Sequence, residues 1–358
     1  YIMNLDHCNT HSSFKDKIYM SNLCQEITLP TTPVQHIDDK EGEIALCILS
    51  AINLGLLTDM NELEELCDLS VRALDEIIDY QEYPVEAAKI SAQSRRSLGI
   101  GYIGLAHYLA KNQVKYEDKK AWKLVDKITE AFQFYLLKAS NNLAKEKTKC
   151  LWFEKTKYSD GILPIDTYKK ELDEIVSREL TYDWEWLRKE IKEHGLRHST
   201  LSAQMPSESS SVVSNATNGV EPPRDYLSVK KSKKGPLKQI VPDYNRLKNY
   251  YTLLWDMKGN EGYINIIAVM QKYFDQAISG NWSYNPENYK DGEVPLSVMA
   301  QDLLTTYKLG WKTAYYQNTY DAKSDIDEPV HPVGWHDGVE ETPKETKEDE
   351  EDCEACTI

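Results

Sequence analysis

A helical apolar pattern between residues 59 and 80 constrains the fold of this chain more strongly than any other feature. Its apolar side chains recur at three- and four-residue steps: Leu63, Leu66, Cys67, Val71, Leu74 and Ile78. This spacing places them along one side of a helix. A helix of this length must bury that side against other elements, so the pattern predicts a large layered domain with Cys67 in its core.

Further helices are expected where the same periodicity returns: residues 87–94, 102–111, 117–146, 164–176, 183–194, 244–257, 262–278 and 294–309. Gly195 stands where a left-handed residue would end a helix. Strands are expected in residues 1–5, around Cys24 and in residues 312–319. This mixture favours an α/β fold, with a barrel whose loops carry the functional site as one layout.

The composition changes after about Tyr320, where Asp, Glu, Lys and Pro dominate residues 321–352. Such a segment cannot bury enough apolar surface to offset its ordering entropy. We therefore expect a folded domain over residues 1–320 and a flexible acidic tail over residues 321–358. The tail ends with two cysteines, Cys353 and Cys356, and no regular element is expected in it.

Composition also narrows the class of function. The chain has 358 residues and a net charge of −16, which argues against a surface that coats nucleic acid. Its one basic run, Lys230–Lys234, is expected to be a solvated loop. No apolar run reaches the roughly 18 residues needed to span a bilayer. Seven cysteines in a long chain indicate a reducing, cytoplasmic setting rather than a disulfide framework.

The segment Asn22-Leu23-Cys24-Gln25-Glu26 is the first candidate site. In an extended strand alternate side chains share a face, so the amide of Asn22, the thiol of Cys24 and the carboxylate of Glu26 would form a row about 6.5–7 Å apart. These groups together are typical of a reaction site. Alone, the segment is also compatible with a buried structural cysteine.

The tail dithiol is the second candidate. Cys353 and Cys356 have no core to fill, and neither Cys nor His lies next to them to complete the four ligands of a structural zinc site. A pair that closes to a disulfide and reopens is the better interpretation. On a mobile arm, such a pair would carry electrons between a buried site and an outside reductant.

Two further motifs carry weaker signals. Adjacent phenols at Tyr315-Tyr316 could pass an electron and a proton in steps, although the chain has 23 tyrosines. Pro206-Ser207-Glu208-Ser209-Ser210 combines hydroxyls with the free N–H groups of a helix start. It predicts either an anion cradle or an ordinary capped helix.

Taken in order, these motifs resemble the large (alpha) subunit of class Ia aerobic ribonucleoside-diphosphate reductase, of the enterobacterial and phage kind. The likeness covers essentially the whole chain. Six ordered segments carry it: Ser21–Glu26, Gly42–Cys47, Met205–Ser210, Asn215–Arg224, Tyr315–Thr319 and the terminal dithiol. The resemblance implies the C-terminal half of a ten-stranded α/β barrel with additional helices.

The resemblance also implies the roles of the site residues. Cys24 would become a thiyl radical that abstracts the 3′-hydrogen of the ribose, and Glu26 would be the base for the 3′-hydroxyl proton. Asn22 would bind the substrate hydroxyls, with Leu23 and Gln25 beside it. Cys47 would belong to the cysteine pair that reduces the substrate, and Tyr315 and Tyr316 to the radical relay. The substrate diphosphate would be bound by Pro206, Ser207, Glu208, Ser209 and Ser210. Cys353 and Cys356 would form the shuttle pair that thioredoxin or glutaredoxin reduces.

The chain itself is expected to bind no cofactor and no metal. The resemblance implies that a di-iron, tyrosyl-radical small (beta) subunit supplies the radical and that thioredoxin or glutaredoxin supplies the electrons. Ribonucleoside diphosphates would be the substrates, and neither nucleic acid nor membrane is an expected partner. His7, Cys8 and His11 have a spacing that resembles a metal motif, but the family pattern gives Cys8 no catalytic role.

Two departures from the family pattern matter. The tail spacing is C-x-x-C, tighter than that of the enterobacterial relative. The family's nucleotide-binding cone, its dNTP specificity site, its first half-barrel and the partner of Cys47 precede the point that corresponds to Tyr1. A half-barrel leaves strand edges unpaired, so we expect this chain to act with an N-terminal half, either because the sequence is truncated or because the gene is split.

Two other classes of function remain open from the sequence. A noncatalytic remnant or interaction module could bind the small subunit or a redox carrier. The retained Asn22, Cys24, Glu26 and Cys47 argue against it. A stand-alone dithiol oxidoreductase is disfavoured, because its C-x-x-C would open a helix in a βαβ context rather than end a charged tail.

Overall fold

The computed structural model describes residues 1–232 and 235–321 of the chain, a mixture of helices and short strands. The first half contains β1 (Ile2–Met3), α1 (Leu5–Thr10), β2 (Ile48–Asn53), α2 (Met60–Tyr80), α3 (Glu86–Arg95), β3 (Leu98–Ile103), α4 (Leu105–Lys111), α5 (Lys119–Glu146) and α6 (Pro164–Thr167). The second half contains α7 (Trp184–His194), α8 (Glu208–Val213), β4 (Leu227–Ser232), β5 (Gly235–Ile240), α9 (Tyr244–Leu247), α10 (Glu261–Gln271), β6 (Trp282–Tyr284), α11 (Leu296–Lys308), β7 (Thr313–Ala314) and β8 (Gln317–Thr319).

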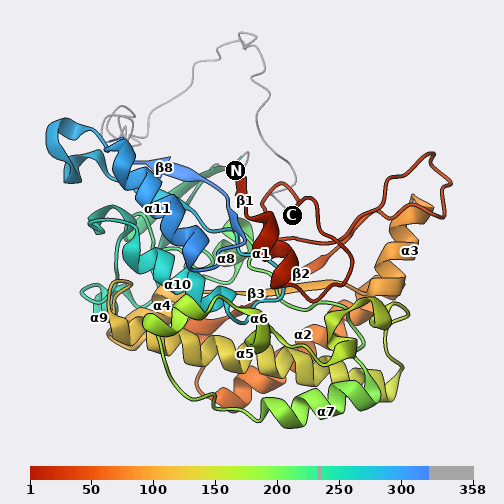
Figure 1. Cartoon of the computed structure of the whole chain (residues 1–358). Coiled ribbons are helices and arrows are strands. Elements are labelled where there is room, and N and C mark those ends of the chain that lie inside the picture. Colours follow the sequence, from red (N-terminus) through yellow and green to blue (C-terminus); the bar gives the residue numbers. More distant parts are fainter. Residues whose placement is uncertain (233–234, 322–358) are drawn as a thin grey trace, which may run out of the picture.

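The predicted helix at residues 59–80 is confirmed as α2. Asp59 caps it by accepting hydrogen bonds from the N–H groups of Asn61 and Glu62. Its apolar side, including Cys67, is buried against α5. Helices α2, α5 and α7 lie side by side and form a layer beside the β2–β3 pair (Figure 1). This layer covers one side of the strands that carry the site.

The strands that position the site run parallel to one another. β2 pairs in parallel with β3. Parallel bridges then continue the row from Ile100 to Ser202 and from Gln204 to Ile278. The described residues therefore place four extended segments side by side, with helices packed against them, which confirms the α/β class. They do not close into a barrel.

At the end of this row formed by the segment around Ile278, the chain contacts its last described residues. The Tyr315 N–H donates to the Gly280 carbonyl at 2.8 Å, and β7 pairs antiparallel with β1. β6 and β8 form a short parallel pair next to it. The predicted strand at residues 312–319 is thus present as two short strands, which bring Tyr315 beside the chain's first residues.

Several predicted elements differ from the structure. The helix expected over 262–278 ends at Gln271, and that over 244–257 is reduced to α9 and a 3-10 turn at Leu254–Asp256. The helix expected over 164–176 is similarly divided into α6 and a 3-10 turn at Lys170–Glu174. The basic run was predicted as a loop, yet Lys230 and Lys231 lie in β4, which forms a hairpin with β5. Lys233, Lys234 and the acidic tail lie outside the described residues.

The core is largely continuous. Trp122, Phe132 and Phe274 lie in one cluster of buried side chains that also contains residues of α2, β3 and α10. A smaller cluster of Cys8, Phe14, Ile18 and Leu29 supports the segment that leads into and out of the Cys24 region. Each helix in the described part of the chain is too short or too polar to cross a membrane.

Candidate functional site

A cavity of about 750 Å³ lies beside β2 and the carboxyl ends of β3 and the 201–204 segment. In parallel α/β sheets, ligands bind at this end of the strands. The lining combines residues that are far apart in the sequence: Cys24, Glu26, Leu49, Ser50, Ala51, Asn53, Ile103, Met205, Pro206, Glu208, Ser210, Ser214, Asn218, Glu221, Arg224, Asn281, Tyr315, Tyr316 and Asn318. The structure therefore brings together three of the predicted motifs.

The segment around Cys24 is a turn, so the strand predicted for Asn22–Glu26 is wrong. Gln25 has a left-handed backbone, with φ of 63°. Asn22 closes the turn, because its N–H donates to the Ile27 carbonyl and its Oδ1 accepts from the Ile27 N–H at 3.1 Å. A turn cannot place alternate side chains in a row. Instead Asn22 contacts Glu26, and Glu26 shares the cavity lining with Cys24.

Glu26 and Asn22 meet directly inside this turn. The Asn22 amide donates to Glu26 Oε1 at 2.9 Å, and the Ser279 hydroxyl lies 3.2 Å from Oε2. Glu26 is buried, and burial raises the pKa of its carboxyl while the two hydrogen bonds oppose that rise. Such a carboxylate is suited to accept a proton from a substrate in the cavity.

Leu23 and Gln25 are not part of the cavity lining, and neither is Asn22. Leu23 is exposed, and the cavity lining does not include it. Gln25 is buried, and its amide nitrogen, in the orientation that satisfies both partners, donates to the carbonyls of Ile2 and Ala314. Gln25 therefore anchors the turn to β1 and β7, which leaves Cys24 and Glu26 to face the cavity.

The two tyrosines form a continuous path from the surface to Cys24. Their ring centroids are 4.0 Å apart and their hydroxyls 3.2 Å apart. Tyr316 is 48% exposed whereas Tyr315 is 6% exposed. Burial, followed by hydrogen bonds with Tyr316 and Cys24, raises the pKa of Tyr315 well above its usual range. The two phenols and the thiol are thus linked by hydrogen bonds in the order Tyr316, Tyr315, Cys24.

Cys47 lies just outside the cavity lining. It precedes β2, and the Gln276 amide donates to its sulfur at 3.4 Å. Burial is the first cause that raises the pKa of the Cys47 thiol, and the nearby charge of Glu26 adds to it. Cys8, Cys24, Cys47, Cys67 and Cys150, the cysteines within the described residues, form no disulfide there. Cys353 and Cys356 lie outside those residues.

The serine-rich loop reaches the cavity with only some of its residues. Pro206, Glu208 and Ser210 line it, at the start of α8. Ser207 is buried instead: its N–H donates to Asn218 Oδ1, and its hydroxyl donates to the Met205 carbonyl. Ser209 is exposed but is not part of the lining. The start of α8 brings backbone N–H groups and the Ser210 hydroxyl to the cavity edge, which suits an anionic group.

The structure adds site residues that motif analysis did not identify. Asn281 donates to Glu221 and accepts from the Tyr316 N–H at 2.9 Å, so it fixes the outer tyrosine. Asn218 and Arg224 also face the cavity. The run 215–224 was among the resembling segments but gave these residues no role. Ser279 and Asn281 had no recognisable signal, because they follow a segment predicted to be helical.

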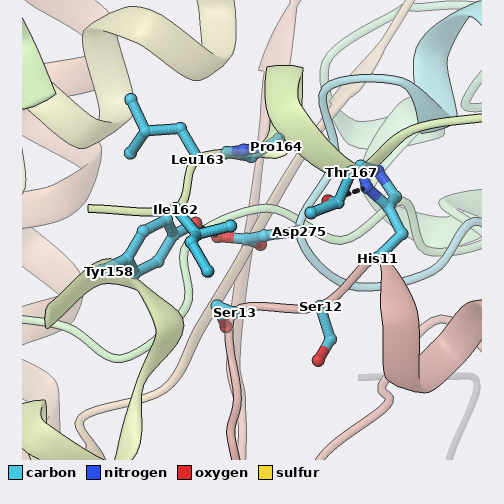
Figure 2. A pocket seen from close by; sticks show the side chains of 9 residues that line it. All are labelled: His11, Ser12, Ser13, Tyr158, Ile162, Leu163, Pro164, Thr167 and Asp275. Atoms are coloured by element: carbon cyan, nitrogen blue, oxygen red, sulfur yellow. Dashed lines mark hydrogen bonds between the residues drawn. The ribbon is translucent and has the colours of Figure 1, made fainter. Parts of the chain in front are cut away.

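His7, Cys8 and His11 serve as packing groups. The two imidazoles stack at 5.1 Å, and the Cys8 thiol donates to the Lys312 carbonyl. His11 contacts Thr167 Oγ1 at 2.8 Å and the Gln271 carbonyl at 2.7 Å. Figure 2 shows the small cavity beside His11, which at about 10 Å³ has room for roughly one water molecule. It is too small for a substrate.

Comparison with known proteins agrees with this geometry. Residues 1–317 match the family described as "Ribonucleotide reductase, barrel domain". The chain is 58% identical to the ribonucleoside-diphosphate reductase subunit alpha of Haemophilus influenzae, across 92% of this chain and 44% of the relative. It is 56% identical to ribonucleoside-diphosphate reductase 1 subunit alpha of Escherichia coli, across 95% and 45%.

A phage protein shows the same relation at greater distance. The ribonucleoside-diphosphate reductase subunit alpha of Enterobacteria phage T4 is 41% identical, across 100% of this chain and 46% of the relative. The chain therefore spans less than half the length of these curated relatives. The family match over residues 1–317 nevertheless covers nearly all of the described residues, and it shows that this chain belongs to the ribonucleotide reductase barrel-domain family.

Proposed function

We propose that this chain is the C-terminal catalytic part of a ribonucleoside-diphosphate reductase alpha subunit, which reduces ribonucleoside diphosphates to deoxyribonucleoside diphosphates. One observation carries the proposal. The hydrogen-bonded side chains Tyr316, Tyr315 and Cys24 end beside the buried Glu26 at a single cavity of about 750 Å³. A radical path, a hydrogen-abstracting sulfur and a base thus converge where a nucleotide could bind.

The proposed reaction begins at Cys24. An electron and a proton leave the Cys24 thiol along Tyr315 and Tyr316, which leaves a thiyl radical. This radical takes the 3′-hydrogen atom of the ribose, and Glu26 takes the proton of the 3′-hydroxyl. The 2′-hydroxyl departs as water after it gains a proton from the thiol pair described below. Cys24 finally returns a hydrogen atom to C3′, which regenerates the thiyl radical. The thiol is restored when an electron and a proton return along Tyr316 and Tyr315.

The two electrons that replace the 2′-hydroxyl come from a pair of thiols. Cys47 is the member that this chain supplies, and its partner would come from the remainder of the alpha subunit. Their oxidation forms a disulfide and releases two electrons and two protons, which the reduction of the sugar consumes. Cys353 and Cys356 would then reduce that disulfide by thiol exchange, with thioredoxin or glutaredoxin as the external reductant.

The substrate diphosphate is proposed to lie at the start of α8. Pro206, Glu208 and Ser210 form that edge of the cavity, and the positive end of the helix favours an anion. Since Ser207 is buried, we assign it to positioning the loop through Asn218 rather than to direct contact through its side chain. We likewise assign no direct substrate contact to the Ser209 side chain, because it lies outside the cavity lining.

Two partners follow from this proposal. Tyr316 is half-exposed, so a small (beta) subunit could dock over it, and a di-iron, tyrosyl-radical centre of that subunit would supply the oxidising equivalent. A second partner would complete the barrel. Within the described residues β2 pairs with β3 alone, so we propose that the rest of the alpha subunit pairs with its other edge and completes a ten-stranded barrel.

The decisive test is Cys24→Ser in the reductase assembled from this chain, the completing alpha-subunit half and a small subunit. We expect reduction of CDP, with thioredoxin as reductant, to fall below detection because a hydroxyl cannot replace the thiol in hydrogen-atom transfer. The matched control is Cys67→Ser, since Cys67 is buried in α2 and its thiol donates to the Phe132 carbonyl, as a serine hydroxyl could. Unchanged turnover in Cys24→Ser would favour a noncatalytic interaction module.

A further inference from the structure

The segment 276–279, between α10 and β6, holds the Cys24 turn in place. The Ala277 N–H donates to the Glu26 carbonyl at 3.0 Å, and the Ser279 N–H donates to the Gln204 carbonyl at 2.9 Å. The Ile278 carbonyl accepts from the Thr313 hydroxyl at 3.0 Å. Three neighbouring segments thus fix this backbone, and a side chain that projects from it has a defined position relative to the site.

Ser279 uses that position to reach two groups of the turn at once. Its hydroxyl donates to the Cys24 carbonyl and also lies 3.2 Å from Glu26 Oε2. The residue is 6% exposed, so bulk water does not replace either contact. Ser279 thus contacts both the backbone of Cys24, the proposed radical-bearing residue, and the proposed base Glu26.

A hydroxyl carries one hydrogen and cannot donate to two acceptors fully at the same time. The Cys24 carbonyl can only accept. Glu26 Oε2 accepts when the carboxyl is ionised and can donate once it is protonated. Two arrangements are therefore possible: the hydroxyl donates to ionised Glu26, or protonated Glu26 donates to the hydroxyl, which then donates to the Cys24 carbonyl.

Asn22 decides which carboxyl oxygen takes the proton. Its Oδ1 accepts from the Ile27 N–H, which fixes the amide so that Nδ2 faces Glu26 Oε1. Oε1 therefore keeps a donor in both arrangements. The proton then belongs on Oε2, the oxygen next to Ser279.

We infer that Ser279 is a positioning residue whose single hydroxyl hydrogen turns from Glu26 to the Cys24 carbonyl when Glu26 takes a proton. This inference rests on the proposed function of Glu26 as the base. Glu26 alone accepts the substrate's proton, and the Ser279 hydrogen only rotates, so no further bond is made or broken. The hydroxyl would thereby link the protonation state of the base to the backbone beneath the radical-bearing sulfur.

Other ionisable groups surround this pair and must be considered in any titration. Cys47 lies within electrostatic range of Glu26. The remaining ionisable groups that face the cavity are Cys24, Tyr315, Tyr316, Glu208, Glu221 and Arg224. None of them replaces the hydroxyl donor of Glu26, for which Asn22 and Ser279 are the side-chain partners.

The test compares Ser279→Ala with Thr313→Val in the assembled reductase. Thr313 is a matched control, because its buried hydroxyl also bonds to the 276–279 segment but does not contact Glu26. Losing a donor to the ionised carboxyl should raise the pKa of Glu26 by about one unit. The acidic limb of kcat for CDP should shift upward equally, about a tenfold loss at fixed pH on that limb, with KM unchanged.

An infrared titration of the Glu26 carboxyl keeps this test separate from the proposed function. The carboxyl band is assigned by its loss in Glu26→Gln, and its titration needs no turnover. A shift of about one unit in Ser279→Ala and none in Thr313→Val supports the inference even if CDP is not the substrate. An unshifted band in Ser279→Ala, or equal shifts in both variants, would overturn it.

Discussion

At the scale of single residues, Gly99 sets how closely Cys47 can lie against β3. A Cβ at this position would be 2.5 Å from Leu49 Cδ2, 3.1 Å from Cys47 Sγ and 3.2 Å from Ala203 Cβ. We predict that Gly99→Ala displaces Cys47 and lowers the free energy of unfolding by about 1–3 kcal/mol, the usual cost of overpacking. Urea denaturation measures this change directly.

Gly259→Ala is the matched control for that substitution. A Cβ at Gly259 meets nothing within 4 Å, and its backbone is not left-handed. The expected change in the free energy of unfolding is within about 0.5 kcal/mol of zero. Equal effects of the two substitutions would contradict the steric role given to Gly99.

The chemistry of the Cys24 turn was predictable from its residues, but its conformation was not. The types of Asn22, Cys24 and Glu26 pointed to a reaction site, and the cavity brings Cys24 and Glu26 together. The turn itself depends on the bond from the Ala277 N–H to the Glu26 carbonyl. That contact joins residues about 250 positions apart, and no local alternation of side chains contains it.

At the scale of elements, long amphipathic helices were predictable and the buried strand β3 was not. α2 and α5 alternate apolar and polar sides, which gives a clear period. All six residues of β3 are buried, so the strand has no alternation to reveal it. The close approach of neighbouring segments explains Gly99 and Gly101 within this strand.

The early end of α10 also has a physical cause outside its own sequence. The buried Lys312 ammonium donates to the carbonyls of Phe274, Asp275 and Gln276 at 2.8–3.3 Å. These carbonyls would otherwise continue a helical pattern. Burial lowers the pKa of Lys312 to about 7, so this contact carries a desolvation cost. The helical period continues in the sequence, but the chain becomes extended and delivers Ser279 to the site.

Asp275 joins the elements around this point. Its carboxylate accepts from the N–H groups of Leu201 and Ser202, at 2.9 and 2.8 Å, and from the Tyr158 hydroxyl at 2.8 Å. Figure 2 shows it beside Tyr158. In Asp275→Asn an amide NH₂ would face one of these donors. We predict a loss of about 2–4 kcal/mol in the free energy of unfolding, measured in urea.

Asp160→Asn provides the comparison for the Asp275 substitution. Asp160 is an exposed acceptor that pairs with Lys15 at 2.8 Å on the surface. Surface pairs of this kind contribute between about 0 and 1 kcal/mol. A loss in Asp275→Asn no larger than that in Asp160→Asn would show that the carboxylate does not hold these elements together.

At the scale of the whole molecule, buried neutral histidines make stability depend on pH. Burial lowers the pKa of His198 to about 4 and that of His7 to about 3. In the unfolded chain both would titrate near 6.5. The unfolded state therefore binds more protons below that pH. The stabilisation from their neutral forms is complete above about pH 7 and is lost as pH falls toward the folded values.

Urea unfolding at pH 7, 6 and 5 tests this linkage. Below pH 6.5, each histidine should make the free energy of unfolding fall with decreasing pH, with a slope that approaches about 1.4 kcal/mol per pH unit. His198→Gln should remove one such contribution, although it also alters contacts with Ser140 and Asp75 and so lowers stability at every pH. The slope is therefore the informative quantity. Identical slopes for His198→Gln and the unsubstituted chain would exclude His198 as a source.

The outer edge of β2 leads to the last prediction. Within residues 1–232 and 235–321, the ladder of β2 runs to β3 alone. Strands of a parallel sheet are normally paired or covered on both sides, so the proposed function predicts that the other part of an alpha subunit completes this edge. We expect that adding the preceding region of the Haemophilus influenzae relative slows hydrogen exchange of the amides in residues 48–53. CDP turnover should appear only in that mixture, with a small subunit and thioredoxin present.

Amides in the middle of α5 serve as the internal reference for this experiment. They are hydrogen-bonded within a helix whose side chains are buried in the chain itself, so their exchange should not change when the second polypeptide is added. Slower exchange at β2 with constant exchange in α5 would locate the contact at the predicted edge. Full turnover by this chain with the small subunit alone, or unchanged exchange at β2 in an active mixture, would show that the site is complete without a strand at that edge.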